Sequence, residues 1–152
     1  MADTRVQLEV EDWVRRNWML LKYGTKFSRE RVKIRSGGVF DFDAVNDDCS
    51  IVATISTSGA RTTSGKYAVG KILKLRSDML FLTMVEAKRR MIVLTEKDMY
   101  DQCLKEAEGK RTPPEIEFVY AEIPEDLNER LVAARKRASE ELSAILPEPL
   151  DR

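Results

Sequence analysis

Two short turns, at 36–38 and 46–48, constrain the fold of this chain more than any other feature of its sequence. The first turn is Ser-Gly-Gly and the second is Asn-Asp-Asp, and these residue types dominate turns. They separate three segments, 26–35, 39–45 and 50–57, in which apolar and polar residues alternate as they do in half-buried strands. Strands joined by turns this short pair antiparallel, so the sequence predicts a three-stranded meander.

Apolar residues at helical spacing predict helices around the meander, and two further apolar runs predict strands between them. The expected helices cover about 6–22, 66–86, 96–108 and 124–147, and the expected strands cover 91–95 and 115–123. A helix between the third and fourth strands usually brings the fourth strand in parallel to a neighbour. We therefore expect an α/β fold, a mixed sheet flanked by helices, formed by a single domain over residues 1–152.

Two of the predicted helices carry features that bear on packing. Gly70 lies inside the helix at 66–86 and costs about 1 kcal/mol of helix propensity, which indicates close packing at that point. The last helix has an apolar stripe, which must be buried on its own domain or on a partner. The stripe consists of Leu127, Leu131, Ala134, Ala138 and Leu142. This stripe predicts a homo-oligomer or a protein partner.

The absence of histidine removes several kinds of active site. It excludes His-based triads, histidine general bases and histidine metal ligands, so any metal would be held by carboxylates, carbonyls or thiols. Cys49 and Cys103 match no zinc spacing and are expected as reduced thiols in or near the core. Lys and Arg total 26, as do Asp and Glu, so no net charge attracts the chain to nucleic acid or membrane.

The chain shows no signal for export or for membrane insertion. It is charged from Asp3 onward, and its apolar stretches are shorter than the ~20 residues that span a bilayer. We therefore expect a cytoplasmic protein that does not contact membranes.

The second and third strand segments place polar residues on faces that can meet. Asp41 and Asp43 share one face of 39–45, with Phe40, Phe42 and Ala44 opposite them. Thr54 and Ser56 share one face of 50–57. With the order of elements from residue 6 to residue 100, these segments resemble the αβββαβ core of the PD-(D/E)xK, or restriction-endonuclease-like, superfamily. In that family the second strand carries an Asp, and the third carries an acidic residue, one spacer and a Lys.

The resemblance implies a nuclease site whose charged residues have been replaced. Asp43 matches the metal-binding Asp, whereas Thr54 stands at the acidic position and Ser56 at the lysine position. In the family, two carboxylates hold a divalent cation such as Mg²⁺, and the lysine stabilises charge on the phosphate. Thr54 and Ser56 supply no charge. We therefore expect a catalytically inactive nuclease-like domain that acts in binding or assembly and holds no cofactor.

Two alternatives remain open. The chain can be a Mg²⁺-dependent nuclease with displaced residues, in which Lys66 or Lys71 replaces the lysine and Glu9 or Glu11 adds a ligand from the first helix. It can also be an unrelated α/β interaction protein, in which the acidic residues of 41–43 form a solvated strand face beside a turn.

The first strand segment carries a basic row that can contact phosphates without reading sequence. The row consists of Arg29, Arg31, Lys33 and Arg35, which Arg61, Lys66 and Lys74 could join. The simpler interpretation, which we favour, is a charged edge strand that prevents pairing with other sheets.

Overall fold

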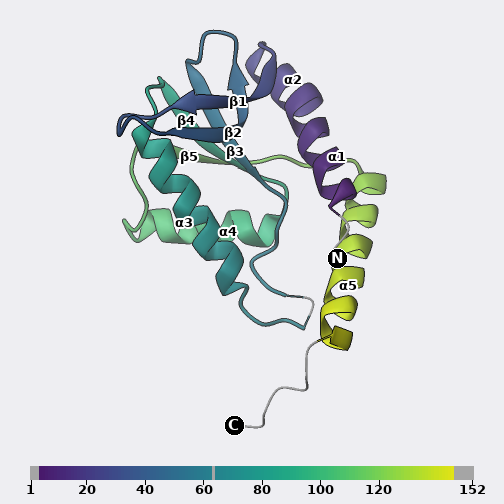
Figure 1. The fold of residues 1–152 in the computed structure, drawn as a ribbon. Helices are drawn as coiled ribbons and strands as arrows, with labels where there is room; N and C mark the ends of the chain where they lie inside the picture. The colour runs from purple at the N-terminus through teal and green to yellow at the C-terminus, as the bar shows by residue number, and fades with distance from the viewer. Residues whose placement is uncertain (1–3, 63, 146–152) are drawn as a thin grey trace.

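A computed structural model of the chain describes residues 4–62 and 64–145, with side chains up to residue 140. Its centre is a five-stranded mixed sheet in the order β1-β2-β3-β4-β5 (Figure 1). The strands are β1 (Phe27–Lys33), β2 (Val39–Asn46), β3 (Ile51–Ser56), β4 (Arg89–Leu94) and β5 (Ile116–Tyr120). Strands β1, β2 and β3 are antiparallel and β3, β4 and β5 are parallel, which confirms the predicted meander and mixed sheet.

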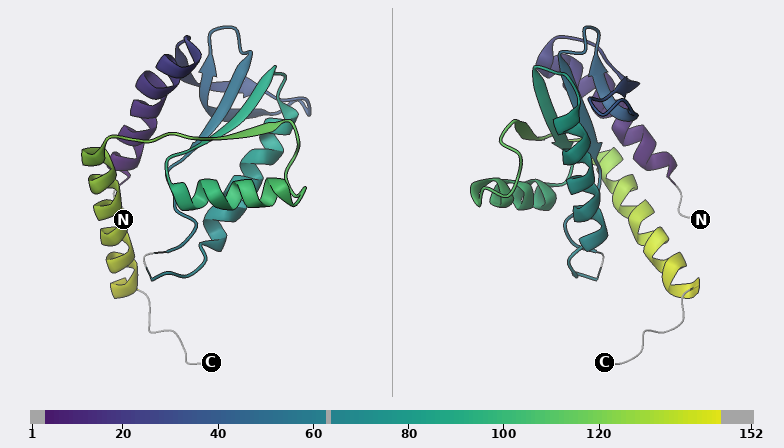
Figure 2. Two further views of the ribbon diagram at one scale, coloured as in Figure 1. Left: turned by 180° about the vertical axis from the view of Figure 1, so that it is seen from behind. Right: turned by 60° about the vertical axis from the view of Figure 1, so that its left-hand side comes forward.

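The helices cover both faces of the sheet. They are α1 (Arg5–Trp13), the π-helical turn η1 (Val14–Trp18), α2 (Met19–Tyr23), α3 (Val69–Met84), α4 (Lys97–Glu108) and α5 (Glu125–Ile145). Helices α3 and α4 lie on one face, whereas the α1–α2 segment and α5 lie on the other (Figure 2). Helix α3 begins later than predicted, at Val69, because an antiparallel bridge pairs Arg61 with Tyr67 just before it.

Two apolar layers fill the space between sheet and helices. Val52 and Ile92 point toward α3 and α4, and their neighbours Ala53 and Met91 point toward α1 and α5. All four are fully buried, as expected for central strands that are covered on both faces.

An extra residue in β2 changes which way its side chains point. Glu30 of β1 pairs with Phe42, and Ser28 pairs with Val45. The two pairs are two residues apart on β1 but three residues apart on β2, so β2 contains one extra residue. Such a β-bulge reverses the alternation beyond it. Phe42 therefore packs on the α3 side while Ala44 packs on the α1 side, so the predicted common face of Phe40, Phe42 and Ala44 is wrong.

The bulge lies where β2 leaves β3. The register between these strands covers only the pairs Ala44–Ala53 and Val45–Val52, whereas β3 continues beside β4 as far as Ser56. Below, the opening between the diverging strands is called the fork. Asp43 is the first residue of β2 on the open side of this fork.

The stripe of α5 is used largely within the domain. Leu131 and Ala134 are buried against the α1 side of the sheet, and Leu127 packs beside them. Arg130 adds a two-point ion pair with Glu9 of α1, with both N–O distances at 2.8 Å. Ala138 is half-buried, and the side chain of Leu142 lies outside the described part of the chain. The first half of the stripe therefore needs no partner.

The two cysteines differ from the expectation in one case. Cys103 is buried, and burial raises the pKa of its thiol to about 12, so it stays protonated. Cys49 is exposed in the turn after β2, where its φ of 58° is left-handed. Among the helices that the structure describes, none is long and apolar enough to cross a bilayer.

Candidate functional site

A cavity of about 410 Å³ opens at the fork, and we call it the fork pocket. Its walls come from β1, β2, β3 and α3. The lining residues are Arg29, Arg31, Val39, Phe40, Asp41, Asp43, Thr54, Lys74 and Asp78. The cavity exists because the pairing of β2 with β3 ends at Ala44 and Ala53, and α3 covers the resulting gap from one side.

Asp43 joins the two strands at the base of the fork. Its Oδ2 accepts a hydrogen bond from the backbone N–H of Ile55 at 2.8 Å. Its carbonyl oxygen accepts a second bond, at 2.6 Å, from Nη1 of Arg15 in η1. One carboxylate oxygen is thus already engaged with β3, and the π-helical turn places an arginine behind the same residue.

Thr54 faces the pocket next to Asp43. It is buried, and its hydroxyl has no hydrogen-bond partner among the described residues. A buried hydroxyl without a partner is destabilising, so it marks the position as unusual. The hydroxyl can offer a neutral oxygen to the pocket but no charge.

Two further carboxylates interact with Asp43 from opposite faces of the sheet. Glu11 of α1 is 8% exposed and Asp78 of α3 is 6% exposed. Burial raises the pKa of each carboxyl group, and the negative charge of Asp43 raises both further. Gln7 and Arg15 act in the opposite sense on Glu11, as does Lys74 on Asp78.

Lys74 is the cation that reaches this cluster from α3. Its Nζ lies 3.3 Å and 3.4 Å from the two carboxylate oxygens of Asp78, one helical turn further along. Both residues line the fork pocket, so α3 supplies one positive and one negative group to it.

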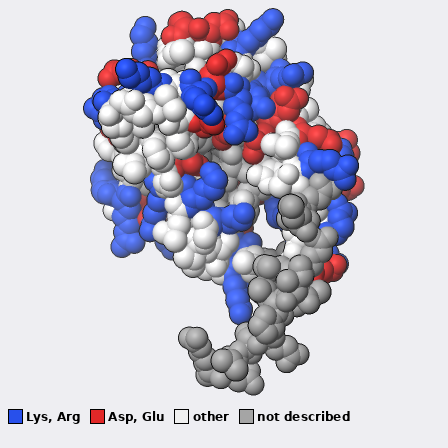
Figure 3. All heavy atoms as spheres, in the orientation of Figure 1, with Lys and Arg blue, Asp and Glu red and all other residues white. Residues whose placement is uncertain are grey.

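The basic row of β1 is partly neutralised where it meets the pocket. Nε of Arg31 lies 3.1 Å from Oδ1 of Asp41, the residue paired with it on β2. The hydrogen bond from Arg31 lowers the pKa of Asp41, and Arg29 lowers it further. Blue and red spheres are interleaved over the upper part of the molecule, where β1 and β2 lie (Figure 3). The row is thus not a purely basic surface on this face.

The structure brings some predicted site residues together and separates others. Asp43 and Thr54 share the fork pocket, whereas Ser56 and Lys66 are not among its lining residues. Ser56 lies two positions beyond Thr54, a displacement of roughly 6.6 Å along a strand. Lys66 is exposed in the loop before α3, where its N–H donates to the Thr62 hydroxyl at 3.2 Å.

The basic residues divide in the same way. Arg29 and Arg31 line the pocket, whereas Lys33 and Arg61 do not. Lys33 closes β1 opposite Val39. Arg61 is turned toward its own loop, over the ring of Tyr67 at 5.6 Å and within 3.1 Å of the carbonyl of Gly65.

Sequence reasoning missed Asp78 altogether and named Glu11 only as an alternative ligand. A signal for both was present in the helical spacing. Asp78 adjoins Met79 on the buried stripe of α3, and Glu11 adjoins Val10 on that of α1. A charged residue on the apolar face of an amphipathic helix is costly to bury and is therefore informative.

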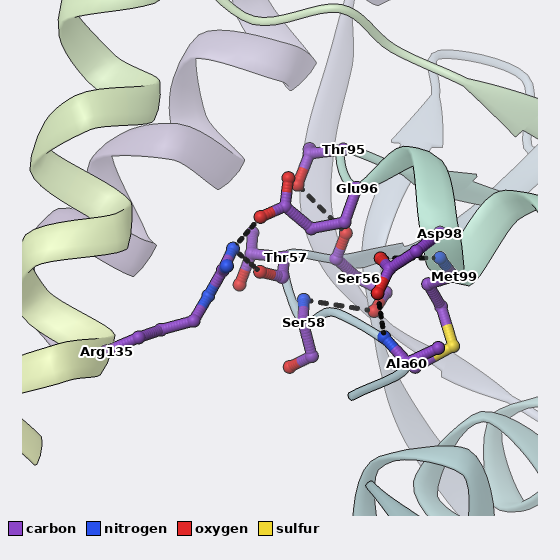
Figure 4. A network of polar contacts seen from close by, with 9 residues as sticks. All are labelled: Ser56, Thr57, Ser58, Ala60, Thr95, Glu96, Asp98, Met99 and Arg135. Carbon is purple, nitrogen blue, oxygen red and sulfur yellow. Dashed lines mark hydrogen bonds and ion pairs between the residues drawn. The ribbon is translucent and has the colours of Figure 1, made fainter. Parts of the chain in front are cut away.

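A second polar cluster closes the far ends of β3 and β4 (Figure 4). Arg135 of α5 donates to the carbonyl of Thr57 at 2.7 Å and forms an ion pair with Glu96. Burial raises the pKa of Glu96, and Arg135 opposes that rise. Asp98 accepts the N–H of Ala60 at 3.0 Å. The polar groups of this cluster are hydrogen-bonded or ion-paired with one another. They join α5 and the loop after β3 to the end of the sheet, which favours a structural role.

The fork pocket does not provide the donors that a nuclease metal would need. Within residues 4–62 and 64–145, no group of three or more acidic or thiol side chains is arranged to hold a metal ion. Hard divalent cations require several oxygen ligands, mostly charged. Here one oxygen of Asp43 is bonded to Ile55, Thr54 is neutral and Asp78 is paired with Lys74.

Comparison with protein-family models, with curated proteins and with solved structures gave no match for this chain. The functional assignment therefore depends on the fork pocket and on the surfaces around it.

Proposed function

We propose that this chain is a restriction-endonuclease-like domain that does not cleave nucleic acid and acts in binding or assembly. One observation carries the first half of the proposal. An acidic residue, Asp43, stands beside a neutral one, Thr54, in the fork, where the resemblance implies two carboxylates.

The arrangement of elements supports the family assignment. A helix, three antiparallel strands, a second helix and a parallel strand follow one another in the order that the resemblance implies. The strands that would carry the catalytic residues are β2 and β3, and they separate beside Asp43. A fold can persist as a scaffold after its chemistry is lost, so the fold by itself does not argue for activity.

The charges at the fork argue against activity. Thr54 adds no charge to hold a cation, and Ser56 adds none to match a phosphate. Removing one preorganised electrostatic contact commonly costs about 2.7–4 kcal/mol in transition-state stabilisation, about a hundredfold or more in rate. Two such losses at one site should leave turnover below detection.

A second candidate is a nuclease that uses displaced residues. It is favoured by one specific observation, the electrostatic interaction of Glu11 and Asp78 with Asp43, together with the approach of Lys74 from α3. In this alternative the lost acidic residue and lysine are supplied by helices instead of by β3.

A plasmid-nicking assay with Mg²⁺ and with Mn²⁺ tests the proposal. We expect no nicking by the unmodified chain. Nicking by the unmodified chain that disappears in Asp43→Ala would overturn the proposal. If Asp78→Asn and Lys74→Ala each abolish that nicking as well, the displaced site would be established. The double variant Thr54→Glu with Ser56→Lys restores the family pattern, and a gain of nicking there would support descent from a nuclease.

A further inference from the structure

The outer face of α3 carries an apolar row that nothing in the described domain covers. Leu73 is 54% exposed and Leu80 is 57% exposed. On the same face, Gly70 precedes Leu73, and Ser77 lies between the two leucines. The spacing from 70 to 73, 77 and 80 alternates three and four residues, the pattern of a helix that packs along another helix. We call these four residues the outer row.

The outer row is separate from the face that α3 buries in its own domain. The buried residues of α3 include Ile72, Leu75, Met79 and Leu82, which lie on the opposite side of the helix. Single exposed leucines are common on protein surfaces. Leu73 and Leu80 are one heptad apart with the small residue Ser77 between them, so together they form a seam along the helix.

Gly70 has open space where close packing was expected. A Cβ added at Gly70 would meet no atom within 4 Å, so the sequence-based expectation of close packing within the domain is wrong. Because Gly70 has no side chain, the helix surface is lower at this point of the outer row. Small residues at such positions let the backbone of a second helix approach closely.

The charges beside the outer row are positive. Helix α3 contains Lys71, Lys74 and Arg76 against a single acidic residue, Asp78, which is buried. Lys74 is paired with Asp78, and Arg76 lies 3.8 Å from Glu106 of α4, but 72% and 56% of their side chains stay exposed to a partner. Lys74 and Arg76 occupy the two positions that flank a heptad seam, where charged side chains select the partner. Blue and white spheres, with few red ones, cover the lower part of α3 in Figure 3.

We infer that the outer face of α3 binds an acidic amphipathic helix of a protein partner. The apolar side of that helix packs on Leu73 and Leu80, and its carboxylates pair with Lys74 and Arg76. This inference rests on the proposed function, in which the domain acts by binding, and it names the surface and the chemistry of the partner.

A second copy of this chain fits the surface poorly. Two outer rows packed together would bring the flanking cations of both copies to the same seam, whether the helices run parallel or antiparallel. Like charges at these positions are destabilising. Charge complementarity therefore favours a partner that carries Glu or Asp at the flanking positions.

Fluorescence anisotropy with labelled synthetic peptides tests the inference. The probe is a three-heptad peptide with leucine along its seam and glutamate at the flanking positions, and its control is the same peptide with lysine in place of glutamate. We expect the glutamate peptide to bind and the lysine peptide not to bind. The double variant Leu73→Glu with Leu80→Glu should weaken binding about tenfold or more, as expected when the centre of an interface is lost.

Matched variants separate the seam from general effects of charge. Leu21 of α2 is 88% exposed, and Leu21→Glu should leave binding unchanged. Arg76→Glu should weaken binding more than Lys71→Glu, because Lys71 lies away from the outer row. Circular dichroism of each variant checks that it is folded.

Several outcomes would overturn the inference. They are equal binding of both peptides, no binding by the unmodified chain, or binding that Leu73→Glu with Leu80→Glu leaves intact. A concentration-dependent dimer that Leu80→Glu abolishes would assign the surface to a second copy, and sedimentation with anionic vesicles lost in the same variant would assign it to lipid. Nicking measured on the same samples keeps the two proposals distinct, because a domain that both nicks DNA and binds the peptide refutes only the proposed inactivity.

Discussion

The carboxylate of Asp43 accepts the backbone N–H of Ile55 at 2.8 Å, at the point where β2 and β3 part. The residue that the resemblance assigns to metal binding therefore has a structural role. It supplies a further contact between two strands whose paired register ends at the neighbouring residue, Ala44.

Asp43→Ala should consequently destabilise the protein as well as alter the fork pocket. The substitution leaves the N–H of Ile55 without its acceptor, and an unsatisfied buried group costs about 1–3 kcal/mol. Asp43→Asn keeps an acceptor oxygen and should cost less. Urea denaturation of the two variants measures the difference, and equal stabilities would show that the bond to Ile55 contributes little.

Glu11→Gln should change how stability depends on pH. Burial, followed by the charge of Asp43, raises the pKa of Glu11 above its usual 4.5 in the folded state. The folded protein therefore holds the proton of Glu11 more tightly than the unfolded chain does. Protonated Glu11 contributes to the free energy of unfolding at low pH, and this contribution is lost as the pH rises through the raised pKa.

The glutamine variant cannot lose that proton. We expect it to be as stable as the unmodified chain near pH 4 and more stable at neutral pH, as measured by thermal unfolding across this range. Glu86→Gln, at an exposed position, is the control. A Glu11→Gln variant that is less stable at neutral pH would mean that the ionised Glu11 is favourable in the fold, contrary to the direction of its pKa shift.

Thr54→Val tests whether the buried hydroxyl serves the fold. The hydroxyl has no partner among the described residues, so replacing it with a methyl group removes a desolvation cost. Stability should increase by roughly 1 kcal/mol in chemical denaturation. A decrease in stability would show that the hydroxyl has a partner.

Arg135→Ala should loosen α5 without unfolding the sheet. It removes the bond to the Thr57 carbonyl and leaves the Glu96 carboxylate, whose side chain is 12% exposed, without its cation. Loss of a charged hydrogen bond costs about 1.5–3 kcal/mol. Hydrogen exchange should accelerate in α5 and in the loop after β3, whereas Lys136→Ala, at an exposed position on the same helix, should change neither.

The order of the elements could be predicted because each one depends on local patterns. The turns at 36–38 and 46–48 required a meander, and the stripe of Ile72, Leu75 and Met79 required a helix. The fork could not be predicted in this way. It depends on one extra residue in β2, and alternation alone gives no sign of a bulge between Phe42 and Val45.

The site was predicted in part for the same reason. Asp43 and Thr54 meet because each lies next to the last paired residue of its strand, Ala44 and Ala53, and the resemblance already pointed to both. Asp78 reaches the pocket from a helix distant in sequence, and only the packing of α3 on the sheet brings it there. The exposure of Gly70 could not be predicted either, because a glycine inside a helix is equally compatible with close packing and with open space.

Calorimetric titration of the unmodified chain with Mn²⁺ tests the central claim, that the fork keeps the frame of a nuclease site without its charges. We predict no binding, because Asp43 is engaged with Ile55, Thr54 is neutral and Asp78 is paired with Lys74. Micromolar binding that Asp43→Ala abolishes would contradict the claim.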